Sequence, residues 1–95
     1  MEPIEPVARA QALAEAAAFD FAIGDEATAL AKLGDAVVVD PVCFEAWLAK
    51  AEVHFALRQF DEALAAGERA AALRPKDIHV HTSLSRIWME RGDKN

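Results

Sequence analysis

The sequence repeats itself weakly every 34 residues. A shift of this length places Pro41 on Pro75, and two such shifts place Gly24-Asp25 on Gly92-Asp93. Small residues coincide under the same shift: Ala17 with Ala51, Ala29 with Ala63, and Ala36 with Ala70. A fixed period of this length is typical of stacked repeats in which each unit is one supersecondary element. Because one such unit cannot bury its apolar face alone, its neighbours must complete the core.

The length and composition predict one small all-α domain over residues 1–95. The chain has a mass of 10.3 kDa, which lies at the lower end of the usual size range for a domain. Alanine, the strongest helix former, supplies much of its apolar content, and tyrosine is absent. A chain of this size buries a smaller fraction of its surface than a large domain does, so we expect modest stability.

Proline, glycine and aspartate residues divide the sequence into five expected helices. The residues before Pro41 and Pro75 are pushed out of the α region, and Gly24 and Gly92 suit helix ends. Asp25 and Asp77 are expected to cap the helices that follow them. The Val37–Val39 run has no partner strand and is interpreted as a helix end. The expected helices cover about 7–22, 26–38, 42–57, 61–73 and 77–90, with short connections that imply antiparallel neighbours.

The middle of the chain carries a set of residues with a known spacing. The set is Trp47, Ala51, Phe60, Ala63, Ala70 and Pro75. With the run Phe60-Asp61-Glu62-Ala63-Leu64, it resembles the tetratricopeptide repeat family. The resemblance implies repeats over about 10–41 and 44–75 and a capping helix over about 77–91. It also implies antiparallel helix-turn-helix units stacked as a right-handed superhelix, in which Ala51 and Ala63 face each other.

Three residues depart from the pattern of that family. Asp20 stands where an aromatic is usual, Lys50 replaces a leucine, and Gly67 replaces a bulky residue. We expect a neighbouring ring, such as Trp47 or Trp88, to fill the volume that these departures leave.

The resemblance implies a protein-protein interaction module with a concave surface made by the first, third and fifth helices. Residues 34 apart should form rows across this surface, and the row of Phe21, Phe55 and Met89 is apolar throughout. An exposed apolar strip is typical of an interaction site. The alternative is that these side chains only pack against each other. The expected site comprises Phe21, Glu45, Leu48, Glu52, Phe55, Arg86 and Met89, and its carboxylates favour basic or hydrogen-bond-donating partners.

The alternative function is self-association as a scaffold or assembly module through the last helix. A stripe of apolar residues, Ile78, Val80, Leu84 and Ile87, is expected to pack on the fourth helix. The opposite face is polar at His81 and Ser85 but apolar at Trp88. Trp88 and Met89 offer too little area for a tight dimer, so we expect a monomer or a weak homodimer.

The titratable and nucleophilic residues do not form a pattern that indicates a reaction, and we expect neither an enzyme nor a cofactor. His79 and His81 point to different faces of a helix, and His54 lies elsewhere, so we expect solvent or groove histidines and no metal site. Cys43 is the only cysteine, and we interpret it as inert. The formal net charge of −6 disfavours nucleic acid, whose phosphates require Lys and Arg.

The positions that bind acidic C-termini in some members of the family are also uncharged or weakly basic here. They are Ala14, Ala18, Ala49, His79 and Ser83, so the resemblance does not extend to that activity. The segment 1–6 does not have the pattern of a signal peptide, and no apolar run is long enough to span a membrane. We therefore expect a cytoplasmic protein that does not bind membranes.

Overall fold

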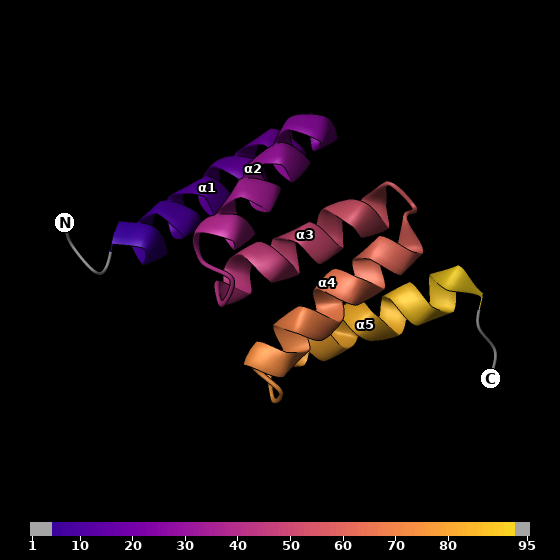
Figure 1. The fold of residues 1–95 in the computed structure, drawn as a ribbon. Coiled ribbons are helices and arrows are strands. Elements are labelled where there is room, and N and C mark those ends of the chain that lie inside the picture. Colours follow the sequence, from indigo (N-terminus) through magenta and orange to yellow (C-terminus); the bar gives the residue numbers. More distant parts are fainter. Residues whose placement is uncertain (1–4, 93–95) are drawn as a thin grey trace.

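The computed structural model describes residues 5–92, and these residues form five helices and no strand (Figure 1). The expected all-α class and number of helices are confirmed, with bounds that differ by two residues at most. The helices are α1 (Glu5–Ala22), α2 (Glu26–Val39), α3 (Phe44–Ala56), α4 (Phe60–Leu73) and α5 (Ile78–Arg91). The signal-peptide interpretation rests mainly on residues 1–4, which lie outside the described residues.

The helices begin and end where the local chemistry requires it. Asp25 Oδ1 accepts a hydrogen bond from the backbone N–H of Thr28 at 3.2 Å and so caps α2. Asp77 Oδ1 accepts from the backbone N–H groups of His79 and Val80, at 2.9 and 3.2 Å, and so caps α5. Both caps satisfy donors that a helix start leaves unpaired, as the sequence predicted.

The chain has a left-handed backbone at three positions that lie 34 residues apart. Gly24 has φ 90°, Arg58 has φ 62° and Gly92 has φ 88°. Glycine adopts this conformation without steric cost, whereas an L-residue with a Cβ does not. The backbone therefore keeps the repeat period at Arg58, even though the glycine is absent from the second copy.

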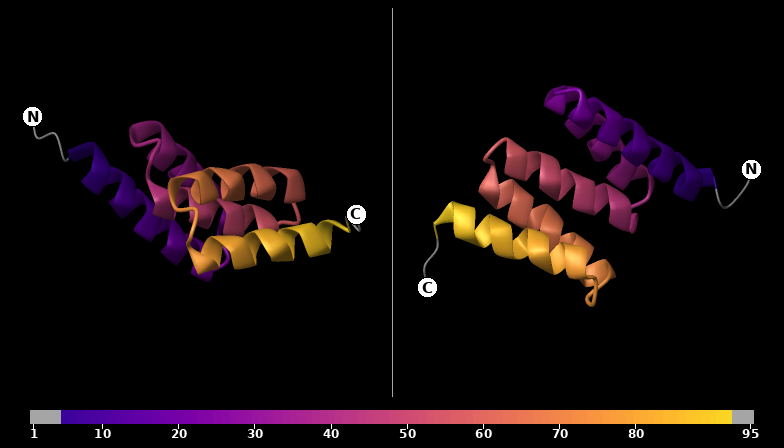
Figure 2. Two further views of the ribbon diagram at one scale, coloured as in Figure 1. Left: turned by 90° about the horizontal axis from the view of Figure 1, so that it is seen from below. Right: turned by 180° about the vertical axis from the view of Figure 1, so that it is seen from behind.

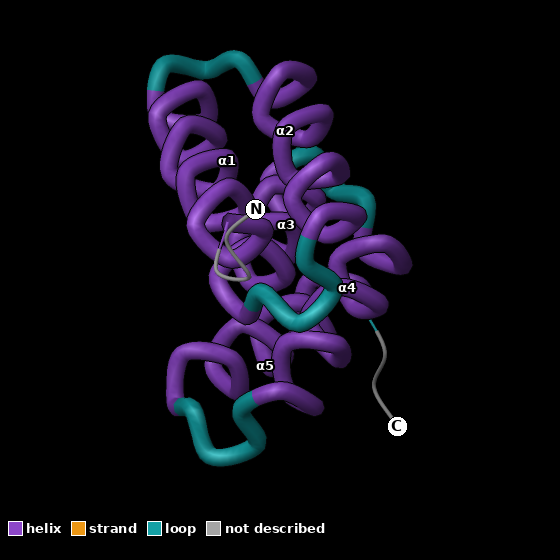
Figure 3. Tube along the Cα trace, turned by 60° about the vertical axis from the view of Figure 1, so that its left-hand side comes forward, coloured by secondary structure: helices purple, strands orange, loops and turns teal. Residues whose placement is uncertain are grey.

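The helices stack in sequence order as two antiparallel pairs and a final single helix. The pair α1–α2 packs on α3, and α5 packs on both α3 and α4. Seen from behind, α1, α3 and α5 lie side by side and form one face of the molecule (Figure 2). The short loops lie at the ends of the helices (Figure 3). This arrangement makes a molecule of 50 × 29 × 18 Å, with α1 near one end and α5 at the other.

The core is built mainly from alanine at the positions that the 34-residue period selects. All six alanines of that register are fully buried: Ala17, Ala29, Ala36, Ala51, Ala63 and Ala70. Small side chains let helices approach closely and pack without voids. Ala70 clusters with Val80 of α5. The largest fully buried side chains are Leu33, Val80 and Ile87.

No tryptophan ring fills the space beside Gly67. The expectation that Trp47 or Trp88 would fill it is therefore wrong. A Cβ placed on Gly67 would lie 2.8 Å from Leu84 Cδ2, because the leucine already occupies the space. Asp20 is buried and pairs with Lys32, whose Nζ lies 2.7 Å from Asp20 Oδ2. An ion pair between α1 and α2 thus replaces an aromatic contact. Lys50 lies with its Nζ 5.8 Å from the centre of the Trp47 ring.

The expected apolar stripe on α5 is confirmed at three of its four positions. Val80 and Ile87 are buried and Leu84 packs against both of their clusters, but Ile78 is exposed. Ile78 is the first residue of the helix. No helix within residues 5–92 combines the length and apolar character that crossing a membrane requires.

Candidate functional site

A hollow of about 330 Å³ lies where α1, α3 and α5 meet. Phe21 comes from the last turns of α1, Glu52 and Phe55 come from the second half of α3, and Arg86 comes from α5. Its remaining lining residues are Ala51, Ala56, Ser83 and Ile87. Because the lining combines two aromatic rings with two opposite charges, the hollow suits a side chain that is partly apolar and partly polar.

Glu52 is the acidic group of this hollow. Its neighbours remove enough water to raise the pKa of the carboxyl, although Arg86 and His79 act in the opposite direction. Glu52 takes part in none of the ion pairs among the described residues, which are Lys32–Asp20, Arg74–Glu45 and Arg91–Asp61. The charged form is therefore partly desolvated, and it forms no direct ion pair among the described residues.

Phe55 connects the hollow to the core of the domain. It is half-buried, and its ring centre lies 5.8 Å from that of Phe60. The Arg86 guanidinium lies 5.0 Å from the centre of the Phe55 ring, within the range of a cation–π contact. Part of the ring is therefore used inside the protein, and part of it lines the hollow.

Two further hollows lie beside the first on the face made by α1, α3 and α5. One, of about 400 Å³, lies between α3, the start of α4 and α5, and is lined by Phe55, Ala56, Arg58, Phe60, Arg86, Met89 and Glu90. The other, of about 370 Å³, lies between α1 and α3 and is lined by Gln11, Ala14, Glu15, Ala18, Glu45 and Ala49. The three hollows together follow the face that the sequence selected as concave, and we call them the groove.

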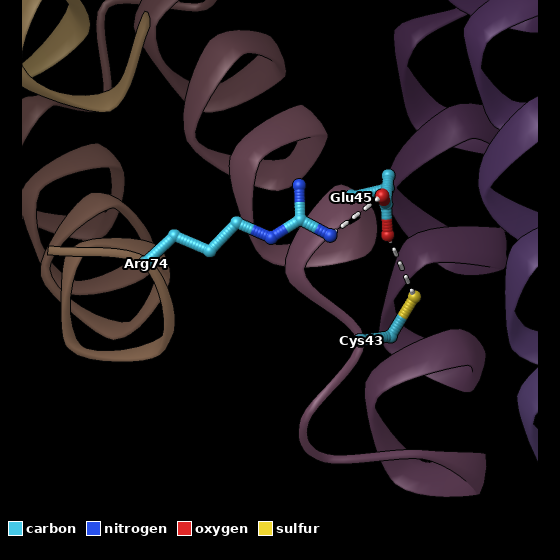
Figure 4. A network of polar contacts seen from close by, with 3 residues as sticks. All are labelled: Cys43, Glu45 and Arg74. Carbon is cyan, nitrogen blue, oxygen red and sulfur yellow. Dashed lines mark hydrogen bonds and ion pairs between the residues drawn. The ribbon is translucent and has the colours of Figure 1, made fainter. Parts of the chain in front are cut away.

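Glu45, which lines the hollow between α1 and α3, contacts Arg74 and Cys43 (Figure 4). Arg74 Nη2 lies 3.3 Å from Glu45 Oε2, and the Cys43 thiol donates to Glu45 Oε1 at 4.0 Å. Cys43 is buried, and the loss of water around the thiol raises its pKa. A thiol with a raised pKa is less reactive at neutral pH, which agrees with the interpretation of Cys43 as inert.

The structure brings six of the seven expected site residues to the groove. Phe21, Glu52, Phe55 and Arg86 share the first hollow, while Met89 and Glu45 line the other two. Leu48 is the exception in this arrangement: it is half-buried and packs against the cluster of Phe44, Ala70 and Val80. Ile87 and Ser83 also line the first hollow, although the sequence had placed Ile87 only in the core.

The histidines differ from the expectation in one respect. His54 is buried, and its Nδ1–H donates to Gln59 Oε1 at 2.7 Å, so it is a structural residue of the α3–α4 turn and the solvent or groove assignment is wrong. His81 Nε2 donates to the Pro75 carbonyl, and His79 is exposed. Within residues 5–92, no three His, Cys, Asp or Glu side chains are grouped as ligands for a metal ion.

Trp88 lies outside the three clusters of buried apolar residues, and 41% of it is exposed. The Arg91 guanidinium lies 5.5 Å from its ring centre, and Arg91 also pairs with Asp61 of α4 at 3.0 Å. The ring is therefore partly covered within the chain, and part of it remains available to solvent.

Comparison with known families supports the resemblance. Residues 44–87, which span α3, α4 and most of α5, match the family model described as tetratricopeptide repeat (TPR). The chain carries a tetratricopeptide repeat. The pair α1–α2 precedes the matched TPR residues and shares their register of buried alanines. No curated protein matches the chain. A TPR is in general a protein-protein interaction module and not a catalytic one.

Proposed function

We propose that this TPR protein binds an extended segment of another protein in the groove of α1, α3 and α5. The observation that carries the proposal is the first hollow, in which Phe21 and Phe55 lie beside an unpaired, partly desolvated Glu52. Enclosed sites with apolar walls and a few polar groups are the usual form of a binding site. The TPR match supports the general class of function.

The charges of the groove favour a partner segment with basic residues. Glu15 and Glu45 line the α1–α3 hollow, whose lining contains no basic residue. Arg86 lines the first hollow beside Glu52, and Arg58 and Arg86 line the α3–α5 hollow beside Glu90. The whole chain carries a formal net charge of −6, which attracts a basic segment at long range. We therefore infer that the partner places a basic residue toward the α1–α3 end and an apolar residue at Phe21 and Phe55.

A peptide-display library screened against the intact protein tests the proposal. We expect the selected peptides to be enriched in Lys or Arg next to a large apolar residue, and to bind the wild-type protein in a fluorescence titration. Phe55→Ala should weaken binding by about fivefold or more if Phe55 is a central anchor, since anchor truncations cost more than about 1 kcal/mol.

Val38→Ala is the matched control, because Val38 is an apolar residue of α2 that is largely exposed and lines none of the three hollows. It should leave the affinity unchanged. If Phe21→Ala and Phe55→Ala both keep the helical content and leave the affinity unchanged, the groove is not the binding site.

A second candidate function, self-association through α5, is favoured by the exposure of apolar side chains on that helix. Ile78 and Met89 are each 78% exposed, and Trp88, next to Met89, is 41% exposed. Trp88→Ser should weaken any self-association with little loss of helical content. If this variant unfolds, Trp88 contributes to the core and the α5 contact does not depend on it.

A further inference from the structure

The outer face of α1 presents apolar side chains that no part of the described chain covers. Phe19 and Ile23 lie one turn apart and are 65% and 63% exposed. Ala8 and Ala12 continue the same stripe toward the start of the helix and are also exposed. We call Ala8, Ala12, Phe19 and Ile23 the α1 outer face. It lies on the side of α1 opposite the buried Ala10, Ala14 and Ala17, near one end of the molecule (Figure 1).

The 34-residue register shows what this face does in the other copies. Phe19 corresponds to Val53 in α3 and to Ile87 in α5, which are only 2% and 1% exposed. Val53 packs in the cluster formed with α1 and α2, and Ile87 packs against Ala63 and Leu64 of α4.

Ala12 corresponds in the same way to Ala46 and Val80, and both of these are fully buried. In α3 and α5, then, the equivalent face receives the helices that precede it. The α1 outer face has the apolar side chains for such a contact and exposes them.

The opposite end of the molecule presents a second face, which residues 5–92 leave uncovered. Ile78, Thr82, Ser85 and Met89 follow helical spacing along α5 on the side away from the buried Val80 and Ile87, and we call them the α5 outer face. All four are exposed and none is charged. An apolar stripe with uncharged polar residues suits burial against another helix.

The charges beside the two faces favour contact between unlike faces. Glu15 lies in the middle of the α1 outer face, between Ala12 and Phe19, and Glu5 and Arg9 lie beside the start of this face. His79, Arg86 and Glu90 flank the α5 outer face. Two α1 faces paired about a two-fold axis would bring the Glu15 carboxylates together, and two α5 faces would bring the Arg86 guanidinium groups together. A pair made of one α1 face and one α5 face places opposite charges side by side.

We propose that copies of this chain associate head to tail, with the α5 outer face of one copy on the α1 outer face of the next. The proposal rests on the second candidate function, self-association through α5, and adds the α1 outer face as the surface that α5 contacts. Because the two faces differ, two associated copies keep one free face of each kind, and the product grows beyond a dimer, as an open chain unless the rotation between copies closes it into a ring. One helix-on-helix contact buries less than the roughly 1,200 Å² of a stable interface, so association occurs only at high concentration.

Sedimentation velocity of the full chain over a range of concentrations tests this inference. The average mass of the wild type should rise with concentration and pass that of a dimer without a plateau. Phe19→Ser removes the α1 outer face, and the double variant Ile78→Ser, Met89→Ser removes the α5 outer face. Each variant alone should stay monomeric, whereas an equimolar mixture should form a heterodimer and nothing larger, because one complete contact remains.

Val38→Ser is the matched control, since it removes an equally exposed apolar side chain from α2 and should associate as the wild type does. Circular dichroism checks that every variant keeps its helices, and Ile23→Ser replaces Phe19→Ser if the latter loses them. If the α1 variant still dimerises alone, the contact is a two-fold contact through α5, and the head-to-tail inference is wrong while self-association stands.

A wild type that stays monomeric at its solubility limit refutes self-association as well. Neither result affects the peptide-binding proposal, which the peptide titration of the Phe55→Ala variant tests separately.

Discussion

Arg58 holds a backbone conformation that its own side chain disfavours, and this gives the sharpest test of the repeat geometry. Its φ of 62° lies in the left-handed region, which costs an L-residue about 1–2 kcal/mol relative to the right-handed form. Glycine at this position removes that cost but adds about 0.4–1 kcal/mol of conformational freedom to the unfolded chain. We therefore expect Arg58→Gly to be more stable than Arg58→Ala by about 0.5–1 kcal/mol.

The alanine variant is the proper reference because Arg58 also makes a contact. Its guanidinium lies 5.2 Å from the centre of the Phe60 ring, and an exposed cation–π contact contributes about 0.5 kcal/mol. Both variants lose this contact, so their difference reports the backbone alone. In a domain of this size a free-energy difference of about 1 kcal/mol moves the midpoint of thermal unfolding by about 4–8 °C.

Urea unfolding of the wild type and both variants measures this difference in the free energy of unfolding. Equal dependence of that free energy on urea concentration shows that only stability has changed. The converse change at an equivalent position is Gly24→Ala, where a Cβ would meet no atom within 4 Å and only the backbone strain is added. It should destabilise by about 1 kcal/mol. If Arg58→Gly is no more stable than Arg58→Ala, the left-handed backbone is not the source of strain and the reasoning fails.

Three further predictions concern the core, an ion pair and the groove. Ala63→Leu should lower the free energy of unfolding by about 1–3 kcal/mol in urea, because the fully buried site of α4 has no room for a larger side chain; a near-neutral result would contradict the close packing. Lys32→Met should lower the free energy of unfolding by about 1–3 kcal/mol in the same measurement, because it leaves the Asp20 carboxylate, 11% exposed, without its partner. The partial exposure of Lys32 reduces this loss. An Asp20→Asn, Lys32→Met double variant should recover part of the loss, and an unchanged Lys32→Met variant would show that the pair contributes nothing.

Glu52→Gln should raise the unfolding midpoint near neutral pH. The folded-state pKa of Glu52 is raised, so the folded protein binds this proton more tightly and its stability falls as pH rises through that range. The gain should disappear below the ordinary pKa of glutamate. A gain that persists there would refute the desolvation argument.

The fold could be predicted from the sequence because its signals are local. Pro41 and Pro75 forbid helix at the residues before them, and Asp25 and Asp77 can cap only the helices that follow them, so the bounds follow from short stretches. The buried alanines repeat at the same spacing as these breaks, which identifies the stacking. Only the 34-residue spacing from Gly24 and Gly92 pointed to the left-handed backbone at Arg58, where the residue type itself argues against it.

The site could be predicted only in part because it depends on packing between three helices. Phe21, Phe55 and Met89 were found because the 34-residue period places equivalent residues on one face. Leu48 was expected in the same site but packs against the cluster of Phe44, Ala70 and Val80, a contact that depends on how α3 packs with α4 and α5. The exposure of Phe19 was missed, although its correspondence with Val53 and Ile87 is visible in the sequence, because burial there requires a preceding helix pair.

The stacking order has a consequence for how the molecule opens. Backbone contacts join α1–α2 only to α3, and none joins either helix to α4 or α5, so α3 is the sole bridge between the two ends of the described chain. In such a stack each element is stabilised only by the elements that it contacts. The α1–α2 pair can therefore unfold while α3, α4 and α5 stay folded. A ligand that touches both Phe21 and Arg86 spans this bridge. Its binding would make the two ends unfold together, so hydrogen exchange in α1–α2 should slow to the rate of α4–α5.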